Sequence, residues 1–379
     1  MRTKETLEQK KRIVLSVTND LVTDQRVHRA CMALMEAGYE VTLIGRQFRT
    51  SKPVHRSYRT VRMRLLFNKK AVFYAEYNIR LFLKLIAVRC DLFYANDTDT
   101  LLANYCAARL RRKPLLFDSH ELFPDTPELV GRERVKHVWQ RIERAIIPRL
   151  HNCITVCHSC AEVLRQRYGV AFGVVRNVPV ASPLKAAPHE EGTPYRLLYQ
   201  GAVNLGRGLE EILDAMPLLD NCQLMVAGVG DHYEQLIEKV KRMGLEDRVE
   251  FLGQLPLERL REVTLQAHLG LAILQDLGLN YRCALPNRIG DYAQCGVPVL
   301  ATDFAEPRRV IEEFGIGALL PSGAEKDPQQ LADAIRTTLA EWDAISPDNR
   351  QQRFERAGEE LCWEHDKKVL IEMVGKALG

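Results

Sequence analysis

Short apolar runs alternate with amphipathic stretches in both halves of the chain. RIVLSV is followed by the helical pattern QRVHRACMALMEAG and by a second apolar run, YEVTLIG. DLFYAND, PLLFDSH and CITVC are further runs, each with a helical pattern after it. Short buried strands that alternate with helices are typical of a parallel sheet with helices on both faces. The pattern therefore predicts a doubly wound α/β domain over residues 1–179.

The alternation stops at residues 180–194 and then restarts. This segment, VASPLKAAPHEEGTP, has three prolines and no periodicity, so it reads as a linker. RLLYQG, LEEILDAM, CQLMVAG and later runs then predict a second α/β domain over residues 195–359. The last stretch, from about 360 to 379, is helical, and we expect it to pack back on the first domain. Two Rossmann-like domains predict a cleft between them, with ligands at the carboxyl ends of the strands.

Composition is that of an ordinary soluble protein. The start, MRTKETLEQKKR, lacks the apolar core of a signal peptide, and no run approaches the length that spans a bilayer. We therefore expect a cytoplasmic protein with reduced cysteines. Cys153, Cys157 and Cys160 lie near two histidines, but their spacing suits a zinc site poorly, and a strand followed by a helix explains it better.

Charge is divided unevenly along the chain. The net charge is +4, but residues 1–178 carry +15 and the remainder −11. Residues 46–89 hold twelve Lys and Arg and a single acid, Glu76, among many aromatic and aliphatic side chains. This segment predicts contact with an anionic membrane surface at the inner face of the cell membrane, or with a lipid-linked acceptor. The alternative is a solvated basic face. We expect no nucleic-acid partner.

A glycine-rich loop follows the first strand of the second domain. In YQGAVNLGRGLEEI, Gly201, Gly206 and Gly208 allow backbone N–H groups to approach a ligand, and Arg207 adds a positive charge. A loop of this kind before a helix suits a phosphate group. A plain strand–helix turn with a solvated Arg207 explains the pattern equally well. The lone GVG at 228–230 is weak evidence for a dinucleotide site, and no GxGxxG or Walker motif follows the first strand.

Two strand ends in the first domain carry titratable residues. FDSHELFPDTPEL ends its strand with Asp118, His120 and Glu121, which makes them active-site candidates. The alternative is that His120 and Glu121 only cap local backbone. YANDTDTLLA places Asp97 and Asp99 at another strand end, and we expect Asp97 to cap the next helix.

A helix with clear end signals lies near residue 290. Pro286 and Asn287 open it, Gly296 ends it, and Asp291 lies one turn inside. Arg288 stands beside its first turn. The helix macrodipole alone would favour an acid at this position.

The order of these motifs resembles the GT-B glycosyltransferases, and in particular glycosyltransferase family 4. The matching pieces are TNDLVTDQRVHRA, FDSHELF, VVRNVP, YQGAVNLGRGLEEI, VAGVGD, VEFLGQLP, LPNRIGDYAQCGVPVLATD and LCWEHDKKVL. The resemblance implies transfer of a hexose from a UDP- or GDP-sugar to a glycan or lipid-linked acceptor. It also implies retention of configuration, no metal or other cofactor, and a place in cell-envelope, exopolysaccharide or glycolipid synthesis.

The resemblance also implies roles for individual residues. Asp291 matches the second acid of a Glu-x7-Glu pair, which binds the donor ribose. Arg207 would neutralise the donor diphosphate, and His120 would lie near the transferred sugar and support an oxocarbenium-like transition state. Glu121 would orient His120 or bind the acceptor. The remaining residues implied in donor binding are Gly201, Asn204, Gly206, Gly208, Pro286, Asn287 and Arg288, and those on the acceptor side are Asn19, Asp20 and Asp24.

Two positions depart from the family pattern. Cys283 stands where the first acid of the pair is expected, and Ala202 stands where an Arg usually follows the loop glycine. Neutralisation of the diphosphate then falls to Arg207, to helix dipoles, and to Arg282 or Arg288. These departures keep two alternatives open: a nucleotide-sugar 2-epimerase of the same fold, or an inactive homologue that acts as a binding or scaffold partner.

Overall fold

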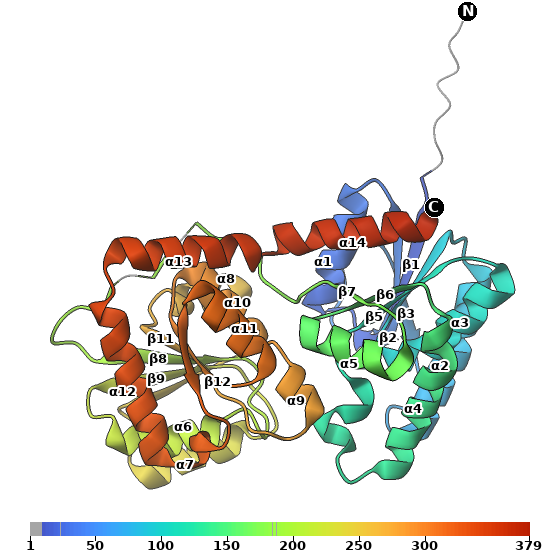
Figure 1. The fold of residues 1–379 in the computed structure, drawn as a ribbon. Coiled ribbons are helices and arrows are strands. Elements are labelled where there is room, and N and C mark those ends of the chain that lie inside the picture. Colours follow the sequence, from blue (N-terminus) through green and yellow to red (C-terminus); the bar gives the residue numbers. More distant parts are fainter. Residues whose placement is uncertain (1–9, 23, 184, 187) are drawn as a thin grey trace, which may run out of the picture. The chain divides into compact units, whose positions relative to one another are not determined.

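The structure is a computed structural model that describes residues 10–379 apart from 23, 184 and 187 (Figure 1). The chain forms two compact units. The first ends at Arg176 and also contains Asp366–Gly379, and the second is Asn177–His365. Each unit is built on one parallel sheet, so the predicted α/β class with two Rossmann-like domains is confirmed.

The first unit has a seven-stranded parallel sheet in the order β3-β2-β1-β4-β5-β6-β7. Its central strands β4 and β5 are buried along their whole length, as expected for apolar runs in a parallel sheet. The strands are β1 Arg12–Asp20, β2 Glu40–Gln47, β3 Arg59–Arg64, β4 Leu92–Asn96, β5 Leu115–Ser119, β6 Asn152–Thr155 and β7 Gly173–Val174.

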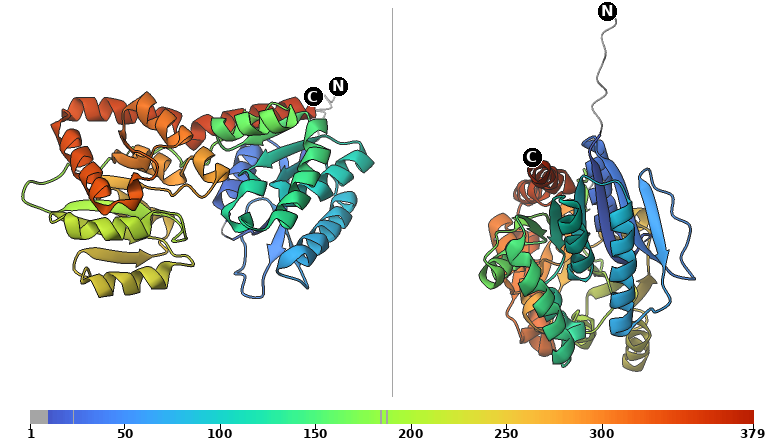
Figure 2. Two further views of the ribbon diagram at one scale, coloured as in Figure 1. Left: turned by 60° about the horizontal axis from the view of Figure 1, so that its bottom comes forward. Right: turned by 90° about the vertical axis from the view of Figure 1, so that its right-hand side faces the viewer.

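Helices cover both faces of this sheet, as the two further views show (Figure 2). Helices α2, α3 and α4 lie side by side on one face. The helices are α1 Gln25–Glu36, α2 Lys70–Ala87, α3 Thr98–Arg111, α4 Glu133–Ile146, α5 His158–Tyr168 and, at the end of the chain, α14 Trp363–Leu378.

A buried ion pair holds α14 to the first unit. The Arg176 guanidinium lies 2.8 Å from Asp366, and the backbone N–H of Arg176 donates to the same carboxylate at 2.6 Å. Met373 of the same helix packs against Gly173 of β7. Asp366–Gly379 therefore belongs to the first unit although it is the last segment of the chain.

The second unit has a six-stranded parallel sheet in the order β10-β9-β8-β11-β12-β13. Its strands are β8 Tyr195–Gln200, β9 Cys222–Ala227, β10 Val249–Gly253, β11 Leu269–Ala272, β12 Val299–Thr302 and β13 Gly317–Leu320. Its helices are α6 Leu209–Ala215, α7 Tyr233–Met243, α8 Leu257–Thr264, α9 Leu279–Cys283, α10 Asn287–Cys295, α11 Ala305–Phe314, α12 Pro328–Ala344 and α13 Pro347–Glu360.

The segment expected to be a linker is attached to the second unit. Ser182 N–H donates to the side chain of Gln294 at 2.9 Å, and Ala186 N–H donates to the carbonyl of Cys295 at 2.6 Å. Both acceptors lie at the end of α10, which closes at Gly296 with a left-handed φ of +74°.

Cys153, Cys157 and Cys160 are buried where β6 leads into α5. Within the described ranges, no group of three or more His, Cys, Asp or Glu side chains is placed to hold a metal ion. Among the same residues, no helix combines the length and the apolar character needed to cross a bilayer.

Candidate functional site

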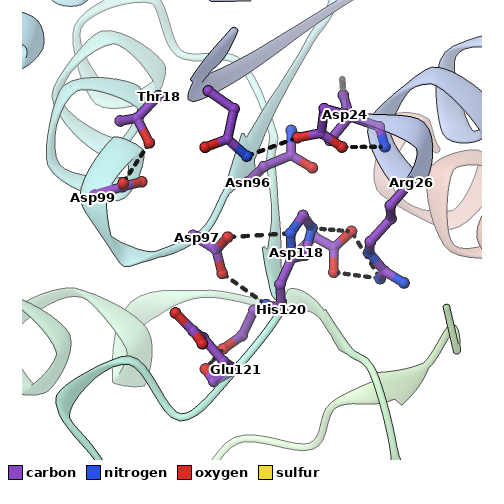
Figure 3. A network of polar contacts seen from close by, with 12 residues as sticks. Thr18, Asp24, Arg26, Asn96, Asp97, Asp99, Asp118, His120 and Glu121 are labelled. Atoms are coloured by element: carbon purple, nitrogen blue, oxygen red, sulfur yellow. Dashed lines mark hydrogen bonds and ion pairs between the residues drawn. The ribbon is translucent and has the colours of Figure 1, made fainter. Parts of the chain in front are cut away.

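His120 lies between two carboxylates at the strand ends of the first unit (Figure 3). It follows β5, and its Nδ1 lies 3.1 Å from Asp97 Oδ2, just after β4. Its backbone N–H donates to Asp97 Oδ1 at 2.8 Å, and its Nε2 lies 3.2 Å from Asp118 Oδ2, within ion-pair distance but without hydrogen-bond geometry. Burial alone would lower the pKa of His120, but Asp97 and Asp118 outweigh it and raise the pKa to about 10. The side chain is therefore an imidazolium at neutral pH.

Asp118 is held ionised by groups that are distant in sequence. Arg26 of α1 contacts its two oxygens at 2.9 and 3.2 Å, and the hydroxyl of Tyr94 donates to it at 2.8 Å. Burial would raise the pKa of Asp118, but Arg26 and then His120 keep it well below its usual range. No sequence motif singles out Arg26 or Tyr94 as a site residue, and the one signal for them is a polar group at an otherwise apolar, buried position.

Asp97 does not cap α3, so that expectation was wrong. It occupies the position before the helix, but its side chain makes no capping hydrogen bond and instead contacts His120. Its backbone has φ of +61° and ψ of +164°, a region that is nearly restricted to glycine and costs on the order of 1–3 kcal/mol. Such strain persists only where surrounding contacts fix the residue. Here the contacts of the Asp97 carboxylate with the ring and the backbone N–H of His120 fix it.

Asp99 is buried in the first turn of α3. Its Oδ2 accepts from Thr18 Oγ at 2.6 Å, whereas its Oδ1 has no partner among the described residues. Burial, and after it the charge of Asp97, raises the pKa of Asp99 to about 7.

Two of the residues expected on the acceptor side are joined directly, because Asn19 Nδ2 donates to Asp24 Oδ2 at 2.9 Å. Asn19, Asp20 and Glu121 line a cavity of about 1130 Å³ in the first unit. Asp20 is also paired with Arg62 of β3 at 3.0 Å. Asp24 caps α1 by accepting from Val27 N–H at 3.0 Å.

In the second unit, the glycine loop packs directly against the loop after β9. Gly201, Gly206 and Gly208 all have positive φ, so the path of this loop suits glycine. A Cβ at Gly228 would lie 1.8 Å from the carbonyl oxygen of Gly201, so the two loops touch backbone to backbone. The GVG segment therefore serves to pack the loops, and Asn204 joins them by accepting from Asp231 N–H at 3.1 Å.

Arg288 is the second residue of α10, and its side chain extends to the carboxyl end of β8 beside this loop. It is 6% exposed, and its guanidinium donates to the carbonyls of Gln200 at 3.2 Å and Ile273 at 3.3 Å. It also stacks 4.4 Å from the ring of Tyr199, and its Nε has no partner among the described residues. Nη1 of Arg288 would lie 3.7 Å from a Cβ at Gly201. The guanidinium charge of Arg288 is therefore next to Ala202, the position at which the family usually has an arginine.

The other candidates of this unit lie around the same strand end. Asp291, one turn into α10, accepts from Gln200 Nε2 at 2.8 Å, which places its carboxylate at the carboxyl end of β8. Arg207 lies 5.1 Å from the ring of Tyr281, and its buried Nε has no partner in the described part of the chain. Arg282 is instead exposed and paired with Asp276 at 2.8 Å.

Solved structures with this fold include several sugar-transferring enzymes. A sucrose-phosphate synthase from Thermosynechococcus elongatus is similar with a TM-score of 0.76 and 19% identity, over 97% of this chain and 98% of that one. HepE from Anabaena, solved in complex with UDP-glucose, is similar with a TM-score of 0.74 and 16% sequence identity. The match covers 96% of this chain and 99% of that one. These similarities establish the class: a GT-B fold.

Sequence families narrow the class further. The family described as "Glycosyltransferase Family 4" matches residues 24–179, and "Glycosyl transferases group 1" matches residues 194–341. A phosphatidyl-myo-inositol mannosyltransferase of Mycobacterium leprae is 28% identical over 205 residues, which are 50% of this chain and 49% of that protein. The chain thus matches about half the length of this curated relative. The chain belongs to the group 1 glycosyltransferases with a GT-B fold, resembling family 4.

Proposed function

We propose that the protein transfers a sugar from a nucleotide-sugar, in the first place a UDP-sugar, to a glycolipid-type acceptor. The observation that carries the proposal is the pair Arg207 and Arg288 at the glycine loop of the second unit. Both guanidinium groups have a buried Nε without a partner in the described residues. The HepE complex with UDP-glucose shows that another protein of this fold binds such a donor.

Arg288 is proposed to compensate for the charge that is missing at Ala202. The proposed diphosphate site lies at the carboxyl end of β8, where Arg288 adjoins Gly201 from below and Arg207 stands at the other end of the loop. The N-terminus of α10, at Pro286 and Asn287, adds the positive end of a nine-residue helix. Preorganised cations and N–H groups of this kind stabilise the charge that develops on a leaving diphosphate. We propose on this basis that the reaction needs no metal ion.

Asp291 is proposed to bind the donor ribose, with Gln200 as its positioning residue. Gln200 Nε2 donates to Asp291, and Gln200 Oε1 accepts from Thr264 at 2.9 Å. This chain of bonds fixes the carboxylate at the strand end. Cys283, at the position of the missing first acid, is buried in α9, so the usual acid contact to the sugar must come from another group.

His120 is proposed to position the donor sugar, not to act as a nucleophile. An imidazolium has no free electron pair on its ring, and both ring nitrogens face carboxylates. Retention of configuration, implied by the family resemblance, stays part of the proposal. The cleft expected between the two domains stays a prediction.

The acceptor side is proposed to face an anionic membrane at its inner surface. Leu66, Phe67, Val72, Ile79 and Leu83 are more than half exposed. They lie in or just before α2, among the basic residues of segment 46–89. The Mycobacterium leprae relative is named for mannosyl transfer to phosphatidyl-myo-inositol, which supports a lipid acceptor. Synthesis of envelope glycolipids or polysaccharides is the proposed setting.

Two assays test the proposal. Thermal unfolding is measured with UDP-glucose and GDP-mannose, and a donor should raise the midpoint of the wild type but not of Arg288→Gln. Arg259→Gln, an exposed arginine paired with Glu262 on α8, is the control and should respond like the wild type.

Nucleotide release is then followed with and without a lipid extract. Release that requires the lipid supports transfer, conversion of the donor into an epimeric nucleotide-sugar without net nucleotide release favours an epimerase, and no thermal response to any nucleotide-sugar favours a scaffold.

A further inference from the structure

A large cavity of the first unit has walls of three chemical kinds. It lies between α2, α4 and the strand ends, and its volume of about 1130 Å³ exceeds the roughly 300–1,000 Å³ of most small-molecule sites. Aromatic and aliphatic side chains form most of the wall. Arg46 contributes a cation, and Asp99 contributes a carboxylate.

The apolar wall remains open to solvent at its edge. Trp139 is buried and makes edge-on contacts with Tyr74, at 4.9 Å, and with Phe123, at 5.0 Å. Ile79 and Val138 line the same cavity and are 63% and 54% exposed. Large apolar groups exposed together at a cavity indicate a site for an apolar ligand.

Arg46 is a buried cation that forms no ion pair among the described residues, because the neighbouring carboxylate of Asp20 is paired with Arg62. It is 8% exposed, and its guanidinium lies 3.9 Å from the ring of Phe48 and 4.4 Å from that of Phe73. Its one side-chain hydrogen bond is a long one, 3.4 Å to Asn68, and its Nε has no partner in the described residues. No carboxylate of the described chain lies within ion-pair distance of it. An anionic ligand would satisfy this group, since a buried unpaired charge is unfavourable.

Asp99 lines the same cavity and has one buried, unsatisfied carboxylate oxygen. The residue is 7% exposed, and only Oδ2 is bonded, to Thr18. Tyr74 also lines this cavity, and burial raises the pKa of its hydroxyl above the usual range. A hydroxyl group of a ligand that donates to Asp99 Oδ1 would satisfy it.

We propose that this cavity binds the acceptor as an anionic amphiphile. Its anionic group contacts Arg46, one of its hydroxyls donates to Asp99 Oδ1, and its apolar part lies on the wall around Trp139. This inference rests on the proposed transferase function and adds the acceptor's chemistry and two residues that recognise it. His120 and Asp97 act electrostatically on Asp99, so the polar end of the cavity adjoins the His120 cluster.

The first test measures binding without any reaction. The probe is dihexanoylphosphatidylinositol below its micelle concentration, which combines hydroxyls, a phosphate and short acyl chains. Trp139 fluorescence reports the cavity, and Trp139→Phe identifies its signal against Trp342 and Trp363 of the second unit. The expected result is a saturable change with this lipid and at least tenfold weaker responses with dihexanoylphosphatidylcholine and with inositol 1-phosphate.

Two variants test the recognising residues, each against a matched control. Asp99→Asn keeps the shape and the bond from Thr18, and Arg46→Gln removes the cation. Each should weaken binding of the inositol lipid by about tenfold or more. The controls are Glu143→Gln, a buried carboxyl whose oxygens are bonded to Thr98 and Tyr168, and Arg111→Gln, which lies over the ring of Phe93 outside the cavity. Both should keep wild-type affinity.

The outcome is read together with the UDP-glucose thermal shift on the same samples. Wild-type affinity in both test variants, or equal binding of the choline lipid, overturns the inference. If the inositol lipid fails to bind while the donor shift persists, the acceptor assignment is wrong and the transferase proposal stands. If the donor shift is absent as well, the proposed function fails with it.

Discussion

His120 should titrate far above the usual range for histidine, and Asp97 should be the main reason. The imidazole lies 3.1 Å from one carboxylate and 3.2 Å from a second. A pKa of about 10 against the ordinary histidine pKa of 6.5 corresponds to about 5 kcal/mol of preference for the imidazolium, at roughly 1.4 kcal/mol per pKa unit. This free energy is an upper bound. The attraction between His120 and Asp118 both raises the pKa of His120 and lowers that of Asp118, so its free energy must be counted only once.

The perturbation is Asp97→Asn. It removes the charge nearest Nδ1, while its side-chain oxygen still accepts from the backbone N–H of His120. Loss of one neighbouring charge should lower the pKa of His120 by roughly 1–3 units. The measurement is a pH titration of the imidazole nitrogens by NMR after histidine-selective ¹⁵N labelling. Asp125→Asn is the control, because this acid is paired with Lys136 and Arg167 and not with His120.

The same shift makes stability depend on pH in a defined direction. A raised folded-state pKa stabilises the folded state fully below about pH 6.5, and this contribution is lost as pH rises toward 10. The wild type should therefore lose more unfolding free energy than Asp97→Asn between these limits. A wild-type His120 that titrates near 6.5, or an Asp97→Asn variant with an unchanged pKa, would refute the reasoning.

Three further predictions concern the donor loop and the basic segment. Arg207→Ala should lower kcat/KM on the true donor by on the order of 100-fold, with Arg259→Ala near wild type; full turnover would remove its role at the diphosphate. Gly228→Ala should lower the unfolding free energy by about 2–3 kcal/mol, because its Cβ would meet a backbone oxygen, whereas Gly358→Ala meets only side-chain atoms beyond 3.5 Å and should be tolerated in the same denaturant titration. Flotation should show binding to anionic vesicles at low salt that weakens at high salt, and an absence of binding at low salt would contradict the membrane proposal for residues 46–89.

The fold was predictable where burial imposes a continuous apolar run. β4, β5 and β8 read directly from the sequence because both faces of a parallel sheet are covered. β3 and α2 were not assigned, and both fall in the basic segment. β3 is the edge strand RTVRMR, which alternates with arginine, and α2 begins after Lys69 without a side-chain cap.

The site was predictable only in its local parts. The glycine loop and the helix start at Asn287 carry short-range signals of turn and cap chemistry. The path of Arg288 to the carbonyls of Gln200 and Ile273 depends on how three separate elements pack, and no local pattern encodes it. Asp97 shows the same limit, because its contact with His120 uses a backbone conformation that sequence propensity disfavours.

The two departures from the family pattern have unequal physical consequences. The charge missing at Ala202 is a loss of net positive potential, and a guanidinium can supply that potential from any neighbouring element. In the proposed function Arg288 does so from α10, with Nη1 3.7 Å from a Cβ built at Gly201, which supports the proposal that diphosphate binding is retained. The acid missing at Cys283 is different, because a hydrogen bond to a sugar hydroxyl depends on an oxygen at one position. The buried thiol of Cys283 cannot replace that oxygen. This departure should therefore change which sugar is accepted more than whether a nucleotide binds.

Affinities for free UDP and for a series of UDP-sugars, measured in the wild type and in Cys283→Glu, separate nucleotide binding from sugar recognition. The variant should alter discrimination among sugars and leave UDP affinity unchanged. Equal effects on UDP and on every UDP-sugar would contradict this division.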